Sequence, residues 1–432
     1  MKGDTMQIHV VEAGQSIFSI AQTYSSTVGA ITGANELPNP NNLVVGQALV
    51  IPIVGSFYWV QSGDSLYSIA RSFGINYQTL ARVNGISPTT PLTIGLRLYI
   101  PPQPRRSVET NAYVEPIAGR VSPELEQSAR SAAPHLTYLA PFSFQIQRNG
   151  TLREPPLNNF RTIADNSGAI LLMAVTNLEQ GQFSTELGRL ILTNPQLQNT
   201  LLDNIIATAK RLNFKDIHFD MEHLPKELRE NYNAFLRKAK ARLSAQGFLM
   251  STALAPKTSA TQAGEWYEAH DYRAHGQIAD FVVIMTYEWG YSGGPAMPVS
   301  PIPQVRQVIE YALTEMPSSK IMMGQNLYGY DWTLPFVQGS TAKAVSPQDA
   351  ILLAANHNVP ISYDTTAEAP HFDYTASDGK HHTVWFEDAR SVQAKFNLIK
   401  ELNLRGISYW KLGIPFPQNW LLIEDNFNVV KR

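Results

Sequence analysis

From residue 110 onward, short apolar runs alternate with segments in which apolar residues recur at helical spacing. Eight such runs occur, and they are rich in β-branched and aromatic residues. They lie at 110–116, 136–146, 169–177, 216–223, 248–256, 280–289, 320–332 and 406–413. Strands that alternate with helices favour a parallel sheet, and eight repeats suit a closed (β/α)8 barrel. We therefore predict an α/β fold with such a barrel over residues 111–432.

Two features refine this prediction. A doubly wound open sheet is the alternative fold, but no G-x-G-x-x-G follows the first run, which weakens it. More than 50 residues separate Trp332 from the helical segment near 389, and they include a hairpin pattern with a turn near Asp378 and Gly379. We predict a small α+β insertion after the seventh strand, forming one wall of a cleft.

The first hundred residues contain an internal repeat. The segment VVEAGQSIFSIAQTY (10–24) matches VQSGDSLYSIARSF (60–73), with a constant offset of 49 residues. Each unit is predicted to run strand, turn, helix, helix, strand, with Ser16 or Ser65 capping the first helix. The offset holds for Gly14 and Gly63, Ala21 and Ala70, Asn35 and Asn84, Gly46 and Gly95, and Pro52 and Pro101.

These units resemble LysM modules, one over residues 7–53 and the other over 57–101. The resemblance rests on the G-[DQ]-S turn, the [FY]-S-I-A helix, the asparagine of the second helix and the closing strand that ends Ile-Pro. It implies binding to the N-acetylglucosamine of peptidoglycan or chitin. The alternative is a pair of spacers without a ligand. A proline- and arginine-bearing stretch follows, and we predict a linker at 102–110.

Composition excludes several classes of protein. Thirty-four basic and 36 acidic residues give a net charge of -2, so the chain lacks the basic footprint of a nucleic-acid binder. The sequence has no cysteine, which excludes disulfides and thiolate metal sites. No apolar run reaches the length of a signal peptide or a membrane span. The sequence implies no cofactor and no obligate protein partner.

The fourth run, within LNFKDIHFDMEHLP (212–225), carries candidate chemistry. With a period of two, His218, Asp220 and Glu222 share one face. Two carboxylates this close favour sharing a proton, which can keep Glu222 protonated as a general acid. Aromatic rings and amides expected at neighbouring strand ends suit a sugar. These are Tyr287, Trp289, Asn326, Tyr328 and Trp410.

The spacing of the two carboxylates narrows the mechanism. Most glycosidases place two carboxylates across the scissile bond, roughly 5 to 9.5 Å apart. Residues i and i+2 on one strand cannot easily straddle a sugar. The spacing instead suits a substrate that supplies its own nucleophile, such as a 2-acetamido group, with Asp220 orienting that group.

At these residues the chain resembles glycoside hydrolase family 18. The family motif D-x-x-D-x-D-x-E appears as KDIHFDME, which keeps Asp220 and Glu222, and M-x-Y-D appears as MTYE. The resemblance implies Glu222 as the acid, Asp220 and Tyr287 as holders of the acetamido group, and Trp410 as the floor under the sugar. Two motif aspartates are replaced by Lys215 and His218, and His218 is expected to replace the inner one by hydrogen bonding or charge.

The chain also resembles the spore cortex-fragment-lytic branch of the family. That resemblance rests on these departures, on the two modules and on the segments MTYEWGYSGGPAMPVSPI and GISYWKLGIPFPQNWLL. That resemblance implies an N-acetylglucosaminidase of spore cortex peptidoglycan, made in the mother cell and deposited on the spore without an export signal. A chitinase and a non-catalytic wall-binding lectin are the alternatives. Retention of Glu222 favours an enzyme over the lectin.

Four other interpretations apply to these residues. His218, Asp220 and Glu222 could bind a metal, but no other histidine motif at ligand spacing supports this. The Asp220–Glu222 pair could be a structural buried network. Tyr328, Tyr330 and Trp332 could simply pack the insertion, and Trp410 could be barrel core.

Overall fold

A closed barrel of parallel strands forms the C-terminal part of the molecule. The computed structural model describes residues 7–102, 104–264 and 266–432. Around the barrel, in spatial order, each strand pairs with the next, and β12 closes the ring by pairing with both β9 and β13. The order is β5 (Arg106–Val114), β6 (Tyr138–Pro141), β9 (Ile170–Thr176), β12 (Asp216–Asp220), β13 (Leu249–Leu254), β14 (Phe281–Ile284), β15 (Ile321–Asn326) and β21 (Gly406–Trp410). Each predicted apolar run supplies one strand, so the predicted (β/α)8 barrel is confirmed and the open sheet is excluded.

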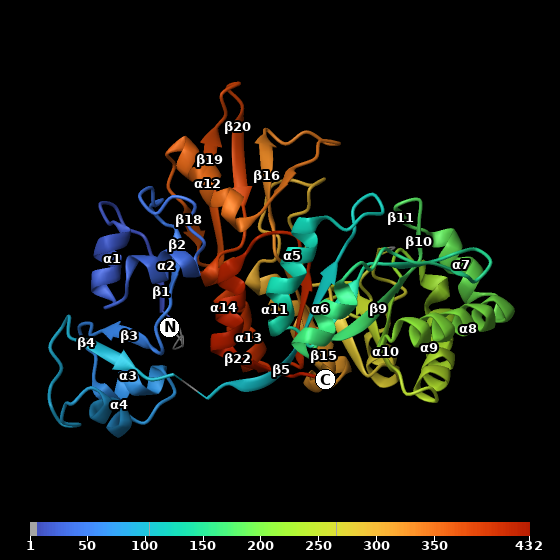
Figure 1. The fold of residues 1–432 in the computed structure, drawn as a ribbon, viewed down its shortest axis with the longest axis horizontal. Helices are drawn as coiled ribbons and strands as arrows, with labels where there is room; N and C mark the ends of the chain where they lie inside the picture. The colour runs from blue at the N-terminus through green and yellow to red at the C-terminus, as the bar shows by residue number, and fades with distance from the viewer. Residues whose placement is uncertain (1–6, 103, 265) are drawn as a thin grey trace.

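Amphipathic helices cover the outside of the barrel (Figure 1). Their apolar faces pack on the outward side chains of the strands and form the largest hydrophobic cluster. No helix in the described ranges is both long and apolar enough to cross a membrane. The covering helices are α5 (Pro123–Ala132), α6 (Phe160–Ser167), α7 (Thr185–Leu192), α8 (Pro195–Leu212), α9 (Arg229–Ser244), α10 (Tyr272–Ile278), α11 (Ile302–Glu315), α13 (Ala389–Glu401) and α14 (Pro417–Asn426).

The first barrel strand begins earlier than the sequence indicated. β5 starts at Arg106, inside the segment 102–110 that we predicted as a linker. Its early residues pair in parallel with β22 (Phe427–Val429), the last strand of the chain. This partner lies more than 300 residues away in sequence, so no local pattern revealed it. The connection between the repeats and the barrel is therefore shorter than predicted.

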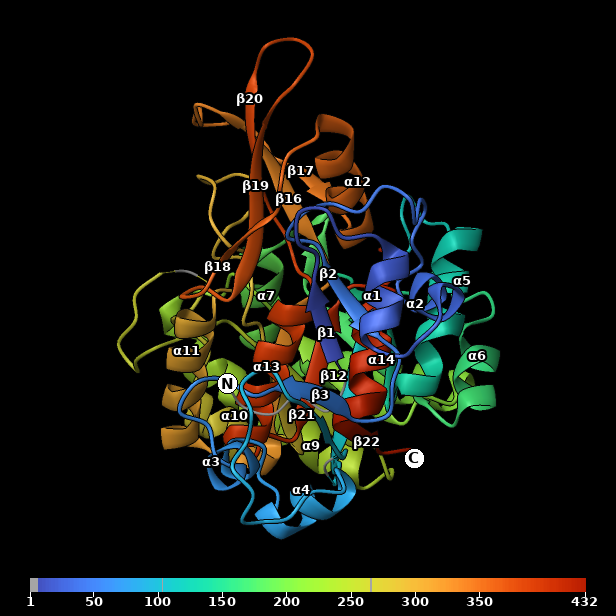
Figure 2. The ribbon, with the colours of Figure 1, turned by 90° about the vertical axis from the view of Figure 1, so that its left-hand side faces the viewer.

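The predicted α+β insertion follows β15. It is an antiparallel sheet in the order β17-β16-β20-β19-β18, packed against α12 (Pro347–His357). Its long hairpin projects from the barrel (Figures 1 and 2) and turns at Gly379, whose φ of +83° suits the predicted glycine turn. The strands are β16 (Gly329–Leu334), β17 (Lys343–Val345), β18 (Ser362–Asp364), β19 (Ala369–Thr375) and β20 (His381–Trp385).

The repeats fold as two small modules of the predicted order. In each, the serine side chain caps the first helix in a reciprocal capping box with the serine three residues later. Asn35 and Asn84 each tie the second helix to the closing strand, through 2.8 Å bonds from Nδ2 to the carbonyls of Val50 and Tyr99. The elements are β1 (Gln7–Val10), α1 (Ile17–Thr23), α2 (Val28–Ala34) and β2 (Ala48–Ile51), then β3 (Ser56–Trp59), α3 (Leu66–Ser72), α4 (Tyr77–Val83) and β4 (Arg97–Ile100).

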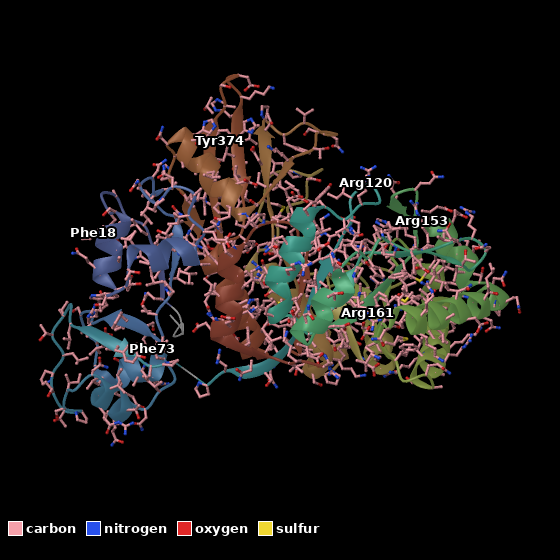
Figure 3. The ribbon with its side chains drawn as sticks, in the orientation of Figure 1. Phe18, Phe73, Arg120, Arg153, Arg161 and Tyr374 are labelled. Atoms are coloured by element: carbon pink, nitrogen blue, oxygen red, sulfur yellow. The ribbon has the colours of Figure 1, made fainter. Side chains whose placement is uncertain are left out.

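The two modules sit differently against the barrel. Module 1 (residues 7–53) packs on α13, α14 and the insertion, and module 2 (57–101) lies below module 1 in the view of Figure 2. Gln418 of α14, itself buried, donates to Asn35 Oδ1 at 2.7 Å and to the Ala48 carbonyl at 2.9 Å. On the far side of module 1, the exposed ring of Phe18 points to solvent (Figure 3). Module 1 thus packs against the barrel and its insertion, while module 2 contacts module 1 and directly precedes β5 in the chain.

Candidate active site

One face of β12 carries four polar side chains into the barrel. Asp216 and His218 are fully buried, Asp220 is 5 % exposed and Glu222, just past the strand end, is 9 % exposed. The alternate residues Ile217 and its neighbours pack outward against the helices. Exposure rises toward the C-terminal end of the strand, where barrel enzymes place their chemistry. The predicted period-two face is therefore real, and it extends one step deeper than predicted, to Asp216.

Asp220 and Glu222 are electrostatically coupled. Their carboxyl groups hydrogen-bond each other. Burial raises the pKa of Glu222 well above its usual range, and the neighbouring charge of Asp220 raises it further. Burial also raises the pKa of Asp220, to about 7, against the effect of its bond to Glu222. The pair therefore holds a shared proton near neutral pH, with Glu222 as the group that keeps it.

The second oxygen of each carboxyl differs in its surroundings. Glu222 Oε2 accepts a hydrogen bond from the indole Nε1 of Trp266, which opposes the upward shift of the Glu222 pKa. Asp220 Oδ1 is buried and has no hydrogen-bond partner among the described residues. A buried carboxylate oxygen without a donor is costly, so Asp220 Oδ1 is the group best placed to receive an N–H from a ligand.

The backbone of Glu222 is also fixed. Asn177, just after β9, accepts from the Glu222 N–H at 3.0 Å and donates to the Glu222 carbonyl at 2.9 Å. This two-bond contact pins the residue at the point where the strand ends. Sequence reasoning missed Asn177 and Trp266. Asn177 ends the run 169–177, which is almost wholly apolar and so marks no inward face, and Trp266 lies in a loop, where no period marks an inward-facing residue.

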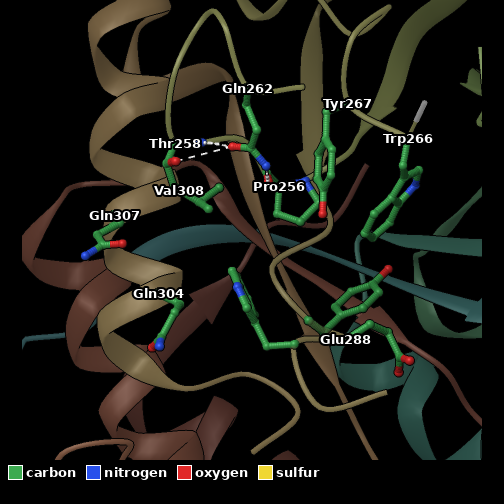
Figure 4. A pocket seen from close by; sticks show the side chains of 11 residues that line it. Pro256, Thr258, Gln262, Trp266, Tyr267, Glu288, Gln304, Gln307 and Val308 are labelled. Carbon is green, nitrogen blue, oxygen red and sulfur yellow. Dashed lines mark hydrogen bonds between the residues drawn. The ribbon is translucent and has the colours of Figure 1, made fainter. Parts of the chain in front are cut away.

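A pocket of about 230 Å³, lined in part by the Trp266 that donates to Glu222, lies between the loop after β13 and helix α11 (Figure 4). Trp266 and Tyr267 stand on the loop side with ring centroids 5.4 Å apart, and Gln304 and Gln307 face them from α11. Tyr287 and Trp289, both predicted as site residues, line this pocket. Rings and amides around a concave surface suit a sugar.

Tyr287 and Trp410 frame the opening of the barrel. Tyr287 is nearly buried, and a Cβ at Gly324 would lie 2.8 Å from its ring, so the glycine leaves room for it. Trp410 ends β21 and is half-buried, edge-on to Phe142 with ring centroids 4.9 Å apart. Both border the same aromatic cluster as Trp266. The structure therefore brings Glu222, Asp220, Tyr287 and Trp410 to one end of the barrel, as predicted.

Two predicted residues are engaged elsewhere. Asn326 is fully buried; its Oδ1 accepts from Ser300 at 2.7 Å, and its Nδ2 donates to the Tyr328 carbonyl at 2.7 Å. The hydroxyl of Tyr328 donates to Glu288, which also accepts from Tyr330 at 3.1 Å. Both side chains thus have protein partners, and they support the wall of the site rather than offering free groups to a sugar.

His218 has neither a charge nor a free nitrogen. Burial lowers its pKa to about 3, so the ring is neutral. Its Nε2 lies 2.9 Å from the Tyr113 hydroxyl and its Nδ1 lies 2.8 Å from Ser251 Oγ. With both nitrogens in use inside the barrel, His218 cannot join Asp220 and Glu222 in binding a metal. His218 therefore acts through hydrogen bonds and not through charge.

Comparison with known proteins assigns the family. The family model of the glycosyl hydrolases family 18 matches residues 120–414, and the LysM domain model matches 9–52 and 58–101. This chain belongs to glycosyl hydrolase family 18. The chain is 64 % identical over 428 residues to the cortical fragment-lytic enzyme of Bacillus subtilis (strain 168), covering 99 % of each chain. It is 54 % identical to the enzyme of that name from Bacillus anthracis, over 99 % of this chain and 100 % of the other.

Solved structures agree. The spore cortex-lytic enzyme SleL of Bacillus megaterium QM B1551 superposes with a TM-score of 0.92 at 56 % identity, over the whole of both chains. SleL of Bacillus cereus gives a TM-score of 0.90 at 50 % identity, over 99 % of each. These matches confirm the predicted family, its cortex-fragment-lytic branch, the two LysM modules and the prediction of a glycosidase.

Proposed function

We propose that this family 18 glycosidase cleaves β-1,4 bonds of N-acetylglucosamine in spore cortex peptidoglycan fragments. One observation carries the proposal. The two coupled carboxyls, Asp220 and Glu222, lie side by side on one strand end and hydrogen-bond each other, so they cannot flank a sugar from opposite sides. A substrate with its own nucleophile is what this arrangement fits. The names of the Bacillus relatives support spore cortex fragments as the substrate.

The proposed reaction uses each side chain at a stated atom. Glu222, protonated, gives its proton to the leaving glycosidic oxygen. The acetamido oxygen of the substrate attacks the anomeric carbon and forms a charged oxazolinium ring. Asp220 Oδ1 accepts the acetamido N–H and stabilises that charge, while the Tyr287 hydroxyl holds the acetamido oxygen in place. Water then opens the ring, Glu222 takes a proton from it, and the site is restored.

The proposal extends to where the enzyme works and what it holds. The LysM modules are proposed to bind the cortex glycan, and the enzyme is proposed to be made in the mother cell and to act at the spore cortex. The LysM matches and the cortical relatives support this. No obligate protein partner is proposed. A chitinase is the rival function, and equal turnover of chitin oligomers and cortex fragments would favour it.

The first test replaces the acid. Glu222→Gln should lower kcat on soluble cortex fragments by about 10²- to 10⁴-fold, the usual loss when a general acid is removed. The matched control is Glu227→Gln, which makes the same change on an exposed residue that pairs with Arg189. Circular dichroism should show both variants folded. A Glu222→Gln enzyme that keeps near-normal turnover would exclude this site.

The second test concerns stereochemistry. Two displacements at one carbon should return the β-anomer, so fresh product should keep the configuration of the substrate. Proton NMR of the anomeric signal within the first minutes, before mutarotation, measures this. An initial α-anomer would mean direct attack by water and would rule out the acetamido mechanism.

A further inference from the structure

A chain of hydrogen bonds crosses the barrel interior beneath the proposed acid. Asn111 Nδ2 donates to Ser408 Oγ at 2.9 Å, and Ser408 hydrogen-bonds the Tyr113 hydroxyl. Tyr113 contacts His218 Nε2 at 2.9 Å, and His218 Nδ1 lies 2.8 Å from Ser251 Oγ. The chain ends where Ser251 donates to Asp216 Oδ1 at 2.7 Å. It links β5, β21, β12 and β13 through side chains that all face inward.

The donors of this chain fix its direction. A serine hydroxyl has one hydrogen, and Ser251 gives it to Asp216. Ser251 must therefore accept from His218, so the proton of the imidazole is on Nδ1. Nε2 is then a bare acceptor, and the Tyr113 hydroxyl donates to it. At the other end the Asn111 atom that faces Ser408 is Nδ2, a donor, so Ser408 accepts from Asn111 and donates its own hydrogen to the oxygen of Tyr113.

With the hydrogen bonds in this direction, His218 has no N–H left to donate to Asp220. Both ring nitrogens are engaged, and no hydrogen bond joins His218 to either carboxyl of the pair in the described residues. Tyr113, in contrast, contacts the proposed sugar platform directly. Its ring lies edge-on to Trp410 with centroids 5.4 Å apart, and its carbonyl accepts the Leu412 N–H at 3.0 Å.

We propose that His218 is a positioning residue that acts through Tyr113 on the Trp410 platform, and not a partner of Asp220. The inference rests on the proposed function, in which Trp410 is the floor under the sugar. Asp216 and Ser251 hold one tautomer of His218, that tautomer aims the Tyr113 hydroxyl inward, and the fixed Tyr113 ring sets the tilt of Trp410. The residue that departs from the family motif thus serves substrate binding rather than proton transfer.

The kinetic test separates the two roles. His218→Leu removes the acceptor for Tyr113, so KM on soluble fragments should rise by about tenfold or more, while the pH profile of kcat keeps its shape. His218→Gln, whose Oε1 can accept from Tyr113, should recover most of the loss. Tyr113→Phe should match His218→Leu, and the double variant should be no worse than either single one.

His275→Leu is the control. His275 is equally buried, and burial likewise lowers its pKa to about 3, but it bonds Thr252 at 3.0 Å in the helix layer. It should lower thermal stability without changing KM. A His218→Leu enzyme with unchanged KM and a displaced pH profile of kcat would overturn the proposal, as would additive effects of the Tyr113 and His218 variants.

The tautomer can be read without substrate, so this test is independent of the proposed hydrolysis. Nitrogen-15 NMR of labelled histidine, with the His218→Gln spectrum subtracted, should show the His218 proton on Nδ1 at every pH between about 5 and 8. A proton on Nε2, or titration within this range, would overturn the proposed chain even if the enzyme cleaves cortex fragments as expected.

Discussion

At the scale of single residues, the inward face of β12 places three acids where they are largely shielded from water. Asp216 is the deepest of them. One oxygen accepts from Ser251, but Oδ2 is buried without a hydrogen-bond partner among the described residues. Burial raises the pKa of Asp216 to about 7, against the lowering effect of the Ser251 bond. At any pH at which Asp216 must ionise, its burial deep in the barrel lowers the stability of the folded protein.

That cost predicts a pH dependence of folding. Because its pKa is about 3.8 in the unfolded chain and about 7 in the folded one, Asp216 binds its proton more tightly in the folded state. Its favourable contribution is complete below pH 4 and is lost as the pH rises to 7, by about 4 kcal/mol at most. Asp216→Asn cannot ionise, so its thermal stability relative to the unmodified enzyme should improve steadily from pH 4 to pH 7.

Parallel stability curves for the two proteins over this range would contradict the assignment. The test compares how the stability of each protein changes with pH, and not the absolute difference in stability between the two proteins. The asparagine leaves an unpaired buried N–H that costs about 1–3 kcal/mol at every pH.

Sequence alone reached only some of these residues. Asp220 and Glu222 could be predicted because a strict period of two, at the end of an apolar run, marks the inward face of a strand. Asp216 carries the same signal two residues earlier, and continuing the period from His218 would have found it. Trp266 carries no such signal, since loops have no period, and Asn177 ends an apolar run without alternation, which marks no inward face. Asn326 was predicted to bind the substrate because the sequence placed it correctly at a strand end. In the structure its side chain accepts a hydrogen bond from Ser300, a partner that only tertiary contacts bring near.

At the scale of elements, the two LysM modules show how one sequence pattern can serve two positions. The loop before the closing strand is covered in module 1 and open in module 2. The Val45 carbonyl accepts from the Ile361 N–H at 2.8 Å, and the Gly46 carbonyl accepts from Arg390 at 3.0 Å. Val44, Gln47 and Ala48 are buried, while their equivalents Thr93, Leu96 and Arg97 are exposed.

Gly46 and Gly95 offer a matched pair to test this docking. Both have φ above +80°, so alanine strains the backbone at either position by about 1–2 kcal/mol. A Cβ at Gly46 would also lie 1.8 Å from the Ile361 carbonyl oxygen, whereas none of the described atoms lies within 4 Å at Gly95. Gly46→Ala should therefore lower the melting temperature clearly more than Gly95→Ala, and should open the 53–57 connection to proteolysis. Equal effects would show that module 1 is not held at this loop.

The repeat could be predicted from its constant offset, but the difference between its copies could not. Docking depends on Gln418 and Ile361, which lie more than 300 residues further along the chain. The copies do differ in sequence at the docking loop, where Val44 and Ala48 stand in place of Thr93 and Arg97 of module 2. That difference does not show what covers module 1, which only the folded chain reveals.

At the scale of the whole molecule, module 1 and the barrel share a core, whereas module 2 has a hydrophobic cluster of its own. Ala48 and Val50 of module 1 belong to the large cluster around the barrel, and Val44 belongs to the cluster of the insertion. Removing residues 1–105 should still leave a barrel that cleaves soluble fragments, because the site lies wholly within it. The truncated protein should nevertheless melt earlier, since it uncovers these apolar contacts and leaves Gln418 without two acceptors.

Differential scanning calorimetry of the truncated barrel measures this loss. Adding separately produced module 1 in excess should raise the melting temperature again, because a partner that binds only the folded state stabilises it. Module 2 made alone is the control and should have no effect.

Binding of the truncated barrel to insoluble cortex should fall strongly, as two linked weak sites are lost. If the truncated barrel pelleted as well as the full chain, the modules would not be the anchor.

The two modules also contact each other. Arg97 of module 2 donates to the Thr23 carbonyl of module 1 at 2.7 Å, and Trp59 lies edge-on to Tyr24. An enzyme on a flexible tether meets substrate at a local concentration set by chain statistics, which falls smoothly with distance. If the LysM modules hold the glycan as proposed, folded protein sets the distance between the held glycan and the site at Asp220 and Glu222. Bonds at that distance would then be met repeatedly from one binding position and other bonds would not, so the architecture would set the interval of cleavage along the glycan.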